Sequence, residues 1–187
     1  PTATLTFARI YRLKKGSGFP VSVPSVDLLE IGAGGGSLAK ADQFGLLKVG
    51  PESAGAEPGP ASYDQGGKVA AVTDADVLLG MLDPKSFLGG DMPLNESKAK
   101  DAVSVISDEL DLSEIDTAAG IHEVVNQNMS AAARMHGVER GIDLRGITLL
   151  AFGGAGPFHA CGVAELLESS KVIFPVNASV LSAFGTL

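Results

Sequence analysis

The order of apolar and polar positions divides the chain into a first part rich in short strands and a later part rich in helices. Runs of β-branched, aromatic and aliphatic residues bounded by Gly and Pro are typical of strands. They predict strands over residues 3–13, 26–31, 37–41 and 45–49, and short extended pieces over 20–24 and 69–72. After residue 73 the apolar residues recur at helical spacing, and this pattern lasts to about residue 140.

Two helices are expected early in that region. Thr73, with Asp76 three residues later, is typical of a helix N-terminus, and this helix would run to Leu82. Asp74 and Asp76 are candidate ligands of a divalent cation, but a role of both carboxylates in capping the helix is favoured. Asn95 is expected to cap the next helix, whose apolar stripe consists of Ala99, Ala102, Val103, Ile106 and Leu110.

The longest predicted helix begins at Ser113 and extends to about Arg140. Its His122 and His136 share a face, because they are fourteen positions apart. At ~1.5 Å of rise per residue they lie roughly 21 Å from each other, too far to bind one metal ion. We interpret each of them as a surface or packing histidine.

The stretch 149–159 reads as a strand, a glycine turn and the start of a helix. A buried strand is expected over 147–152, and a helix over 158–167 with Pro157 at its first position. The turn between them is Gly153, Gly154, Ala155 and Gly156. Such a turn lets a ligand approach the backbone and the free N–H groups of the helix, although it can also serve only as a sharp, well-packed turn. Neither a P-loop ending nor G-x-G-x-x-G spacing is present.

A second glycine-rich loop covers residues 32–37, with four glycines in five residues, including Gly34, Gly35 and Gly36. Glycine weakens ordered segments, so the loop is either a tight reversal or lies against something that leaves no room for side chains. Residues 50–60 are rich in Gly and Pro, which predicts an irregular segment. We interpret it as an ordered loop rather than a linker.

Composition narrows the possible functions. The net charge is −8; residues 1–26 carry four basic and no acidic residues, so the remainder carries −12, and we expect no nucleic-acid partner. Apolar runs are shorter than the ~20 residues of a membrane helix, so no membrane association is expected.

Cys161 is the only cysteine, and we interpret it as a small core residue on the helix side opposite His159. With a single cysteine, a cytoplasmic location is expected. The start at Pro1 suggests a fragment of a longer chain.

Several motifs together resemble the hydantoinase A/5-oxoprolinase family, which also includes a subunit of acetone and acetophenone carboxylases. The resemblance is to the N-methylhydantoinase A-like branch at residues 11–18. The motifs occur in order at residues 31–37 (IGAGGGS), 49–60 (VGPESAGAEPGP), 72–76 (VTDAD) and 151–157 (AFGGAGP).

The resemblance implies an α/β fold, part of an actin-like nucleotide-binding domain similar to those of sugar kinases and heat-shock ATPases, with a helical insertion. Residues 1–72 would form a β-rich part with Gly-rich loops, 73–146 the helical insertion, and 147–187 a strand–glycine turn–helix–strand unit. The whole chain would then be a fragment of one larger domain. The cofactor would be ATP with Mg²⁺, bound by Gly34, Gly35, Gly36, Gly153, Gly154, Ala155 and Gly156.

The implied function is that of a fragment of an ATP-dependent hydrolase subunit that opens a cyclic amide of the hydantoin or 5-oxoproline type by phosphorylating its carbonyl oxygen. A subunit of a ketone carboxylase and a non-catalytic partner-binding subunit are the alternatives. A second hydantoinase-type subunit is the expected partner in a hetero-oligomer. The family's Asp-Met-Gly-Gly-Thr-like phosphate loop is not found in residues 1–31. We therefore expect this chain alone not to hydrolyse ATP, and no catalytic residue is assigned.

Overall fold

The computed structural model describes residues 6–7, 24–25 and 28–185, which fall into two units, residues 1–30 and 31–187. In the first unit, β1 (Thr6–Phe7) pairs with β2 (Pro24–Ser25) in antiparallel fashion. The rest of the expected strand over 3–13, and the extended piece before Pro24, lie outside the described residues. The strand expected over 26–31 is wrong for its described part, because residues 28–31 form no strand and are exposed.

The second unit begins with a β-hairpin. Strands β3 (Ser37–Ala41) and β4 (Leu47–Ser53) are antiparallel, with Ala39 opposite Val49. The strand over 37–41 is confirmed. The strand expected over 45–49 starts two residues later and continues through Pro51 to Ser53, so part of the segment taken as irregular belongs to the hairpin. Beyond it, the backbone N–H of Ala54 donates to the carbonyl of Gly36.

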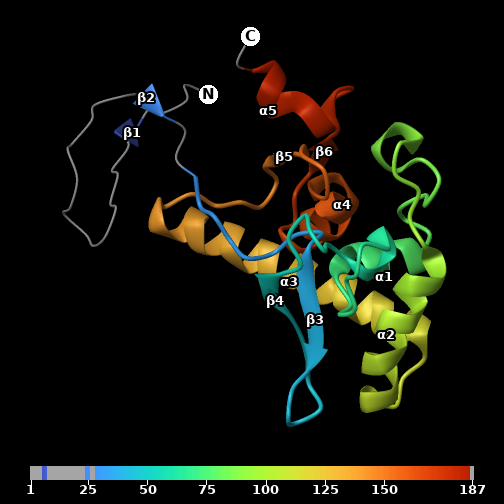
Figure 1. Cartoon of the computed structure of the whole chain (residues 1–187). Helices are drawn as coiled ribbons and strands as arrows, with labels where there is room; N and C mark the ends of the chain where they lie inside the picture. The colour runs from blue at the N-terminus through green and yellow to red at the C-terminus, as the bar shows by residue number, and fades with distance from the viewer. Residues whose placement is uncertain (1–5, 8–23, 26–27, 186–187) are drawn as a thin grey trace. The chain divides into compact units, whose positions relative to one another are not determined.

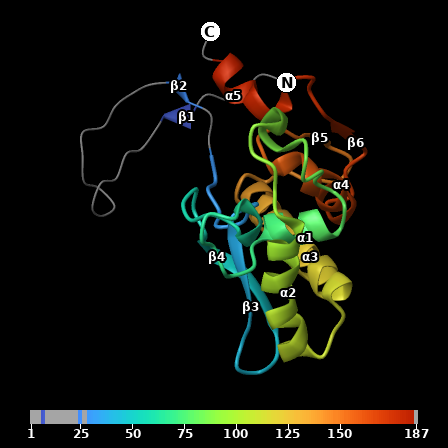
Figure 2. The same cartoon turned by 45° about the vertical axis from the view of Figure 1, so that its right-hand side comes forward.

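Helices α1 (Val72–Leu78), α2 (Glu96–Leu110) and α3 (Glu114–Glu139) lie together beside this hairpin (Figures 1 and 2). Short 3₁₀ turns, η1 (Ala61–Tyr63) and η2 (Phe87–Gly90), lie before and after α1. Asn95 caps α2 as predicted, and Ser113, where the longest helix was expected to begin, caps α3; each accepts a bond from the backbone N–H three residues on.

The prediction for α1 is wrong at both ends. Ala71 is the N-cap residue, and the helix ends at Leu78 rather than at Leu82. Thr73 lies inside the first turn, where its N–H and hydroxyl both donate to the carbonyl of Gly35, at 2.8 and 2.9 Å. The carboxylate of Asp74, not that of Asp76, accepts the N–H of the cap residue at 2.8 Å.

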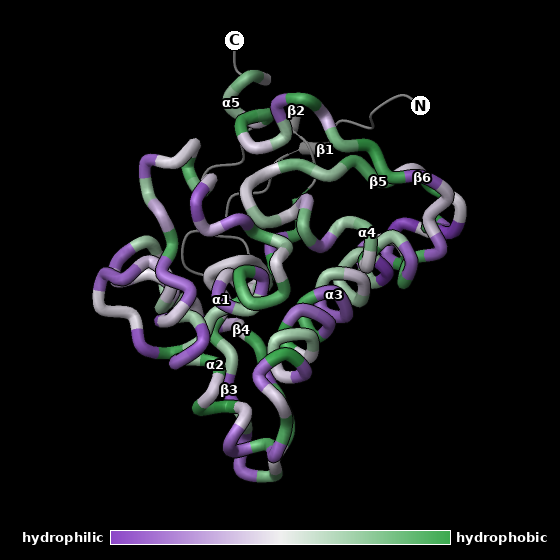
Figure 3. Tube along the Cα trace, turned by 90° about the vertical axis from the view of Figure 1, so that its right-hand side faces the viewer, coloured by the Kyte–Doolittle hydropathy of each residue, from purple (hydrophilic) through white to green (hydrophobic). Residues whose placement is uncertain are grey.

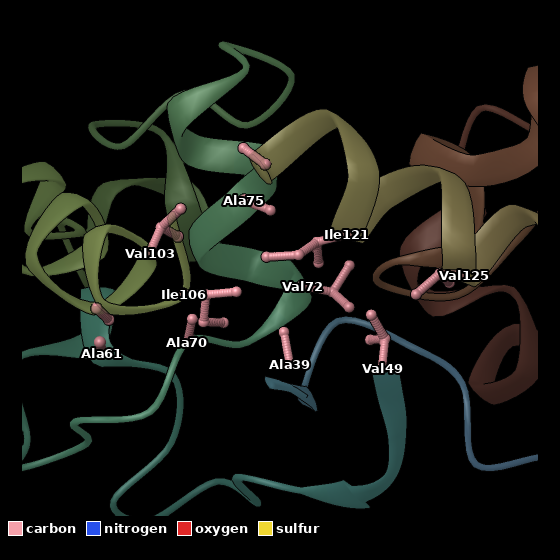
Figure 4. Packing of buried hydrophobic residues seen from close by; sticks show 12 residues of the cluster. Ala39, Val49, Ala61, Ala70, Val72, Ala75, Val103, Ile106, Ile121 and Val125 are labelled. Carbon is pink, nitrogen blue, oxygen red and sulfur yellow. The ribbon is translucent and has the colours of Figure 1, made fainter. Parts of the chain in front are cut away.

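One core joins these elements. Aliphatic side chains from the hairpin, α1, α2 and α3 point toward one another in Figure 4, and the buried members include Ala39, Val49, Val72, Ala75, Val103, Ile106, Ile121 and Val125. Most of the apolar stripe predicted for α2 faces this core, with Leu110 partly buried against it, whereas Ala99 packs with Val77 and Leu94 in a second cluster. Burial of such side chains is worth about 1.5–3 kcal/mol each for the larger ones, so this core holds α1 and α3 in place relative to the hairpin.

The last part is a β–α–β unit followed by a short helix. Strands β5 (Thr148–Leu150) and β6 (Lys171–Ile173) are parallel, and α4 (Gly156–Leu166) connects them; η3 (Ala178–Val180) and α5 (Leu181–Phe184) follow. The expected strand is present but not buried. Leu150 and Phe152 are nearly half exposed, although β5 lies in a stretch that is coloured hydrophobic in Figure 3. Within the described residues, α4 packs on this small sheet through β6.

Candidate functional site

The first glycine loop is folded into a tight turn. The N–H of Ser37 donates to the carbonyl of Gly34 at 2.9 Å, and the hydroxyl of Ser37 accepts the N–H of Gly34 at 3.0 Å. A Cβ added to Gly36 would lie 2.9 Å from Ser53 Oγ, whereas one added to Gly34 would meet open space. Both alternatives left open by the sequence apply: the loop is a tight reversal, and it also lies against neighbouring groups that crowd most of its glycines, while Gly34 faces open space.

The two predicted glycine segments come together, although they are about 120 residues apart in sequence. A Cβ on Gly35 would lie 3.3 Å from Cβ of Ala155 and 3.0 Å from Thr73 Oγ1. The loop 32–36, the first turn of α1 and the turn before α4 therefore meet at one place, which we call the glycine junction. Glycine at position 35 allows this close approach, because a side chain there would press on both neighbours.

The turn before α4 is open on its outer side. Its Gly153 has φ of +92°, a conformation that favours glycine, and its N–H donates to the carbonyl of Ala178 at 2.8 Å. A Cβ at Gly153, Gly154 or Gly156 would meet no atom within 4 Å. Packing therefore does not explain why Gly154 and Gly156 lack side chains. Their open surroundings, beside the N-terminus of an 11-residue helix, suit the approach of an anionic ligand.

A pocket of about 500 Å³ is lined in part by the first loop. Gly36, Ser53, Tyr63, Phe87 and Met92 are among its lining residues, and the rings of Tyr63 and Phe87 are 5.4 Å apart. The pocket combines apolar and aromatic walls with backbone groups of the loop. This lining suits a flat or ring-shaped organic molecule.

Asp74 has a structural role. Its side chain is fully buried and accepts three backbone N–H groups, from Ser62 at 2.7 Å, Ala71 at 2.8 Å and Ala61 at 3.2 Å. These bonds join η1 to the start of α1, and they use the lone pairs that a cation would need. The capping role favoured by the sequence is confirmed for this residue.

Asp76 instead faces α3. One of its oxygens, Oδ1, lies 2.8 Å from Nδ1 of His122, and both side chains are almost completely buried. The imidazole of His122 is stacked on that of His159 from α4, with ring centroids 4.4 Å apart. Asp76, His122 and His159 therefore form a buried cluster. Asp76 lies about one helical turn beyond Thr73 on α1, and His159 lies about one turn beyond Gly156 on α4.

His159 has no exposed surface, and its Nδ1 lies 2.9 Å from Oδ1 of Asn126. An amide oxygen only accepts hydrogen bonds, so Nδ1 carries the proton and Nε2 has a free lone pair. That Nε2 is buried without a hydrogen-bond partner, which costs about 1–3 kcal/mol. Burial lowers the pKa of His159, with the nearby Asp76 carboxylate opposing and His122 adding to the shift, which favours the neutral ring.

Sequence reasoning missed this cluster. It placed His122 among surface or packing histidines and compared it only with His136, on the same helix. Nothing in the sequence around Asp76 indicates that its partner is a histidine 46 positions away. Cys161 is also corrected: it is exposed rather than a core residue, on the side of α4 away from the buried His159.

Comparison with known proteins identifies the class to which this fold belongs. The crystal structure of an ATP-dependent caprolactamase from Pseudomonas jessenii superposes with a TM-score of 0.79 at 44% identity, over 88% of this chain and 24% of that one. The mixed α/β fold expected from the sequence is confirmed, in agreement with an actin-like ATPase-type domain.

The chain belongs to the hydantoinase/oxoprolinase family, whose family model matches residues 3–187. It is 43% identical to the caprolactamase subunit alpha of Pseudomonas jessenii over 90% of its length, and 43% identical to the acetophenone carboxylase gamma subunit of Aromatoleum aromaticum over 89%. It spans about a quarter of these relatives, 24% and 23% of their lengths. Among the described residues, no helix combines the length and the hydropathy needed to cross a membrane.

Proposed function

We propose that this chain is part of a subunit of an ATP-dependent cyclic amide hydrolase, and that its glycine junction contributes to the nucleotide site. The hydrolase would open a ring of the hydantoin or 5-oxoproline type after the carbonyl oxygen is phosphorylated. The family membership and the similarity to an ATP-dependent caprolactamase support this reaction class. A second hydantoinase-type subunit is the proposed partner, since the relatives are named as subunits.

The observation that carries the nucleotide assignment is the approach of Gly35 to Ala155. Two glycine-rich segments meet there, and Gly34, Gly154 and Gly156 still face open space. The N-terminus of α4 supplies positive potential without a bulky side chain. ATP with Mg²⁺ is the proposed cofactor, with the adenosine side of the nucleotide next to residues 153–156.

The aromatic pocket beside Gly36 is a separate feature of the same loop. We propose it as a candidate for the adenine ring or the cyclic amide, because both are flat and largely apolar on their faces. Tyr63 and Phe87 would contact the ring, and backbone groups near Ser53 would set its orientation.

The second candidate function is that of an ATP-dependent ketone carboxylase subunit. It is favoured by one observation: the identity to the acetophenone carboxylase subunit equals that to the caprolactamase subunit, at 43%. Ketone and lactam substrates both present a carbonyl oxygen to be phosphorylated, so the same nucleotide site would serve either reaction.

The test is substrate-stimulated ATP hydrolysis by the full-length subunit with its partner, across a panel of lactams, hydantoins and ketones. Stimulation by a cyclic amide without added bicarbonate supports the hydrolase. Stimulation by a ketone that requires bicarbonate supports the carboxylase. No stimulation by any member, with nucleotide binding absent as well, would refute both proposals.

A further inference from the structure

We propose that Asp76, His122 and His159 bind a divalent transition-metal ion, with Zn²⁺ as the first candidate. One ligand atom from each residue lies within 4.8 Å of the others, and all three residues are buried. The three come from α1, α3 and α4, so an ion would join α3 to the two helices that begin at the glycine junction. This site is distinct from the Mg²⁺ that accompanies ATP.

The free lone pair of His159 is the strongest argument. Its Nδ1 proton is engaged by Asn126, which leaves the buried Nε2 as an acceptor without a donor. Histidines that bind metal ions almost always donate the other ring N–H to a carboxylate, carbonyl or amide oxygen. His159 shows this arrangement, whereas Nδ1 of His122 lies 2.8 Å from the carboxylate of Asp76, which is itself a proposed ligand.

Asn126 is closely packed against α4. Gly162 of α4 lies so close that a Cβ there would be 2.5 Å from Nδ2 of Asn126. Oδ1 of the same amide lies 2.9 Å from Nδ1 of His159. A supporting residue held in one orientation is what a binding site needs in order to present its ligand atoms consistently.

The donor set selects the metal. Two imidazole nitrogens and a carboxylate oxygen suit Zn²⁺, Co²⁺, Mn²⁺ or Fe²⁺, whereas Mg²⁺ and Ca²⁺ prefer oxygen ligands throughout. Neighbouring ligand atoms of a tetrahedral zinc ion lie about 3.3 Å apart, given Zn–N bonds of about 2.0–2.1 Å. The widest pair here, at most 4.8 Å apart, would close by about 1.5 Å. Three protein ligands leave one position for water or another ligand.

The experiment uses the tag-free full-length subunit, stripped with a chelator and titrated with Zn²⁺ in a non-coordinating buffer. We expect the wild-type subunit to bind one more Zn²⁺ ion per chain than the folded His159→Gln and His122→Gln variants. Any binding that remains at this site in the variants should be at least a hundredfold weaker. Asn126→Ala should retain the ion but bind it about 10–100-fold more weakly. His136→Gln is the matched control, because His136 lies on the same helix outside the cluster, and its metal content should equal that of the wild type.

Cobalt provides a readout that does not depend on activity. One equivalent of Co²⁺ should give the visible absorption bands of a nitrogen-ligated ion in wild type and in His136→Gln, and not in His159→Gln. Equal zinc content and equal cobalt spectra in wild type and folded His159→Gln would overturn the proposal. If the variants fail to fold, wild-type protein that shows neither a cobalt band nor a zinc-dependent rise in Tm overturns it as well.

Discussion

Nδ1 of His159 on α4 lies 2.9 Å from Oδ1 of Asn126 on α3, although 33 residues separate them in sequence. The bond is possible because Gly162, one turn further along α4, leaves room for the rest of the Asn126 amide. The close packing of α3 against α4 at this point thus depends on glycine at position 162.

Gly162→Ala should destabilise the protein although alanine favours helices. The new Cβ would lie 2.5 Å from Asn126 Nδ2, so the amide must move and the bond to His159 weaken. We expect a loss of about 1–3 kcal/mol, seen as a lower Tm of the full-length subunit. Gly120→Ala in α3 is the control, since its Cβ would meet only the end of the Leu47 side chain, at 3.0 Å, and a near-neutral effect is expected. Equal melting temperatures for both variants would contradict this account.

Gly154→Val should weaken nucleotide binding more than it weakens the fold. A side chain at Gly154 enters open space and Gly154 lacks the positive φ of its neighbour, so the folding cost is small. A branched side chain there would occupy the proposed path of the adenosine, and we expect affinity to fall at least about tenfold, or about 1.4 kcal/mol. Nucleotide titration and a melting curve on one sample measure both effects.

Gly153→Val is the matched comparison. Its φ of +92° strains a branched residue by about 1–3 kcal/mol, so this variant should lower Tm. If Gly154→Val instead lowers Tm and leaves the affinity of the folded protein at the wild-type value, residues 153–156 form a structural turn and the nucleotide assignment is lost.

Asp74→Asn should be strongly destabilising. The carboxylate accepts three backbone N–H groups, and an amide can offer only one oxygen to them while its NH₂ faces donors. We expect a loss of roughly 2–4 kcal/mol, because hydrogen bonds to a charged acceptor are worth about 1.5–3 kcal/mol each. Asp101→Asn, on the exposed side of α2, should leave Tm unchanged. A similar Tm for both variants would show that the Asp74 carboxylate does not stabilise the connection between η1 and α1.

The turn of the β3–β4 hairpin should weaken in acid. Asp42 accepts the N–H groups of Phe44 and Leu46 and pairs with Lys48 at 2.9 Å. The Lys48 bond, followed by the backbone bonds, lowers the pKa of this carboxyl below its usual 3.8. A lowered pKa means that the stabilisation is complete above pH 3.8 and is lost as the pH falls through the folded value.

The measurement for Asp42 is the difference in Tm between wild type and Asp42→Asn as a function of pH. We expect wild type to be the more stable above pH 5, and the difference to shrink as the carboxyl is protonated. A difference that stays constant down to pH 3 would show that the ionised carboxylate contributes nothing to the hairpin.

Cys161→Ala should leave ATP turnover within about twofold of wild type. The thiol is exposed, while the histidine two residues earlier is buried on the other side of α4, so no base is placed to activate it. Turnover by the full-length complex is the readout, with Tm measured to confirm folding. A thousandfold loss in a folded variant would assign the thiol a chemical role.

Local patterns determined much of the molecule. Asn95, Ser113 and the apolar stripe of α2 predicted two helices correctly, because capping and helical spacing act within a few residues. The glycine turn before α4 was predicted for the same reason, and the family motifs predicted the fold class. The prediction for α1 failed at its boundaries, because Ala71 rather than Thr73 is the N-cap residue. The strand predicted over residues 28–31 is absent, and no described strand pairs with these residues.

Only the tertiary structure decided what these elements do together. The approach of Gly35 to Ala155 and the cluster of Asp76, His122 and His159 depend on how α1, α3 and α4 pack around a shared core. Sequence spacing describes neighbours on one helix, so it compared His122 with His136 and missed His159 on another. The burial of an apolar core sets distances between helices that no local pattern contains, and those distances turn two separate histidines and a helix carboxylate into a candidate site.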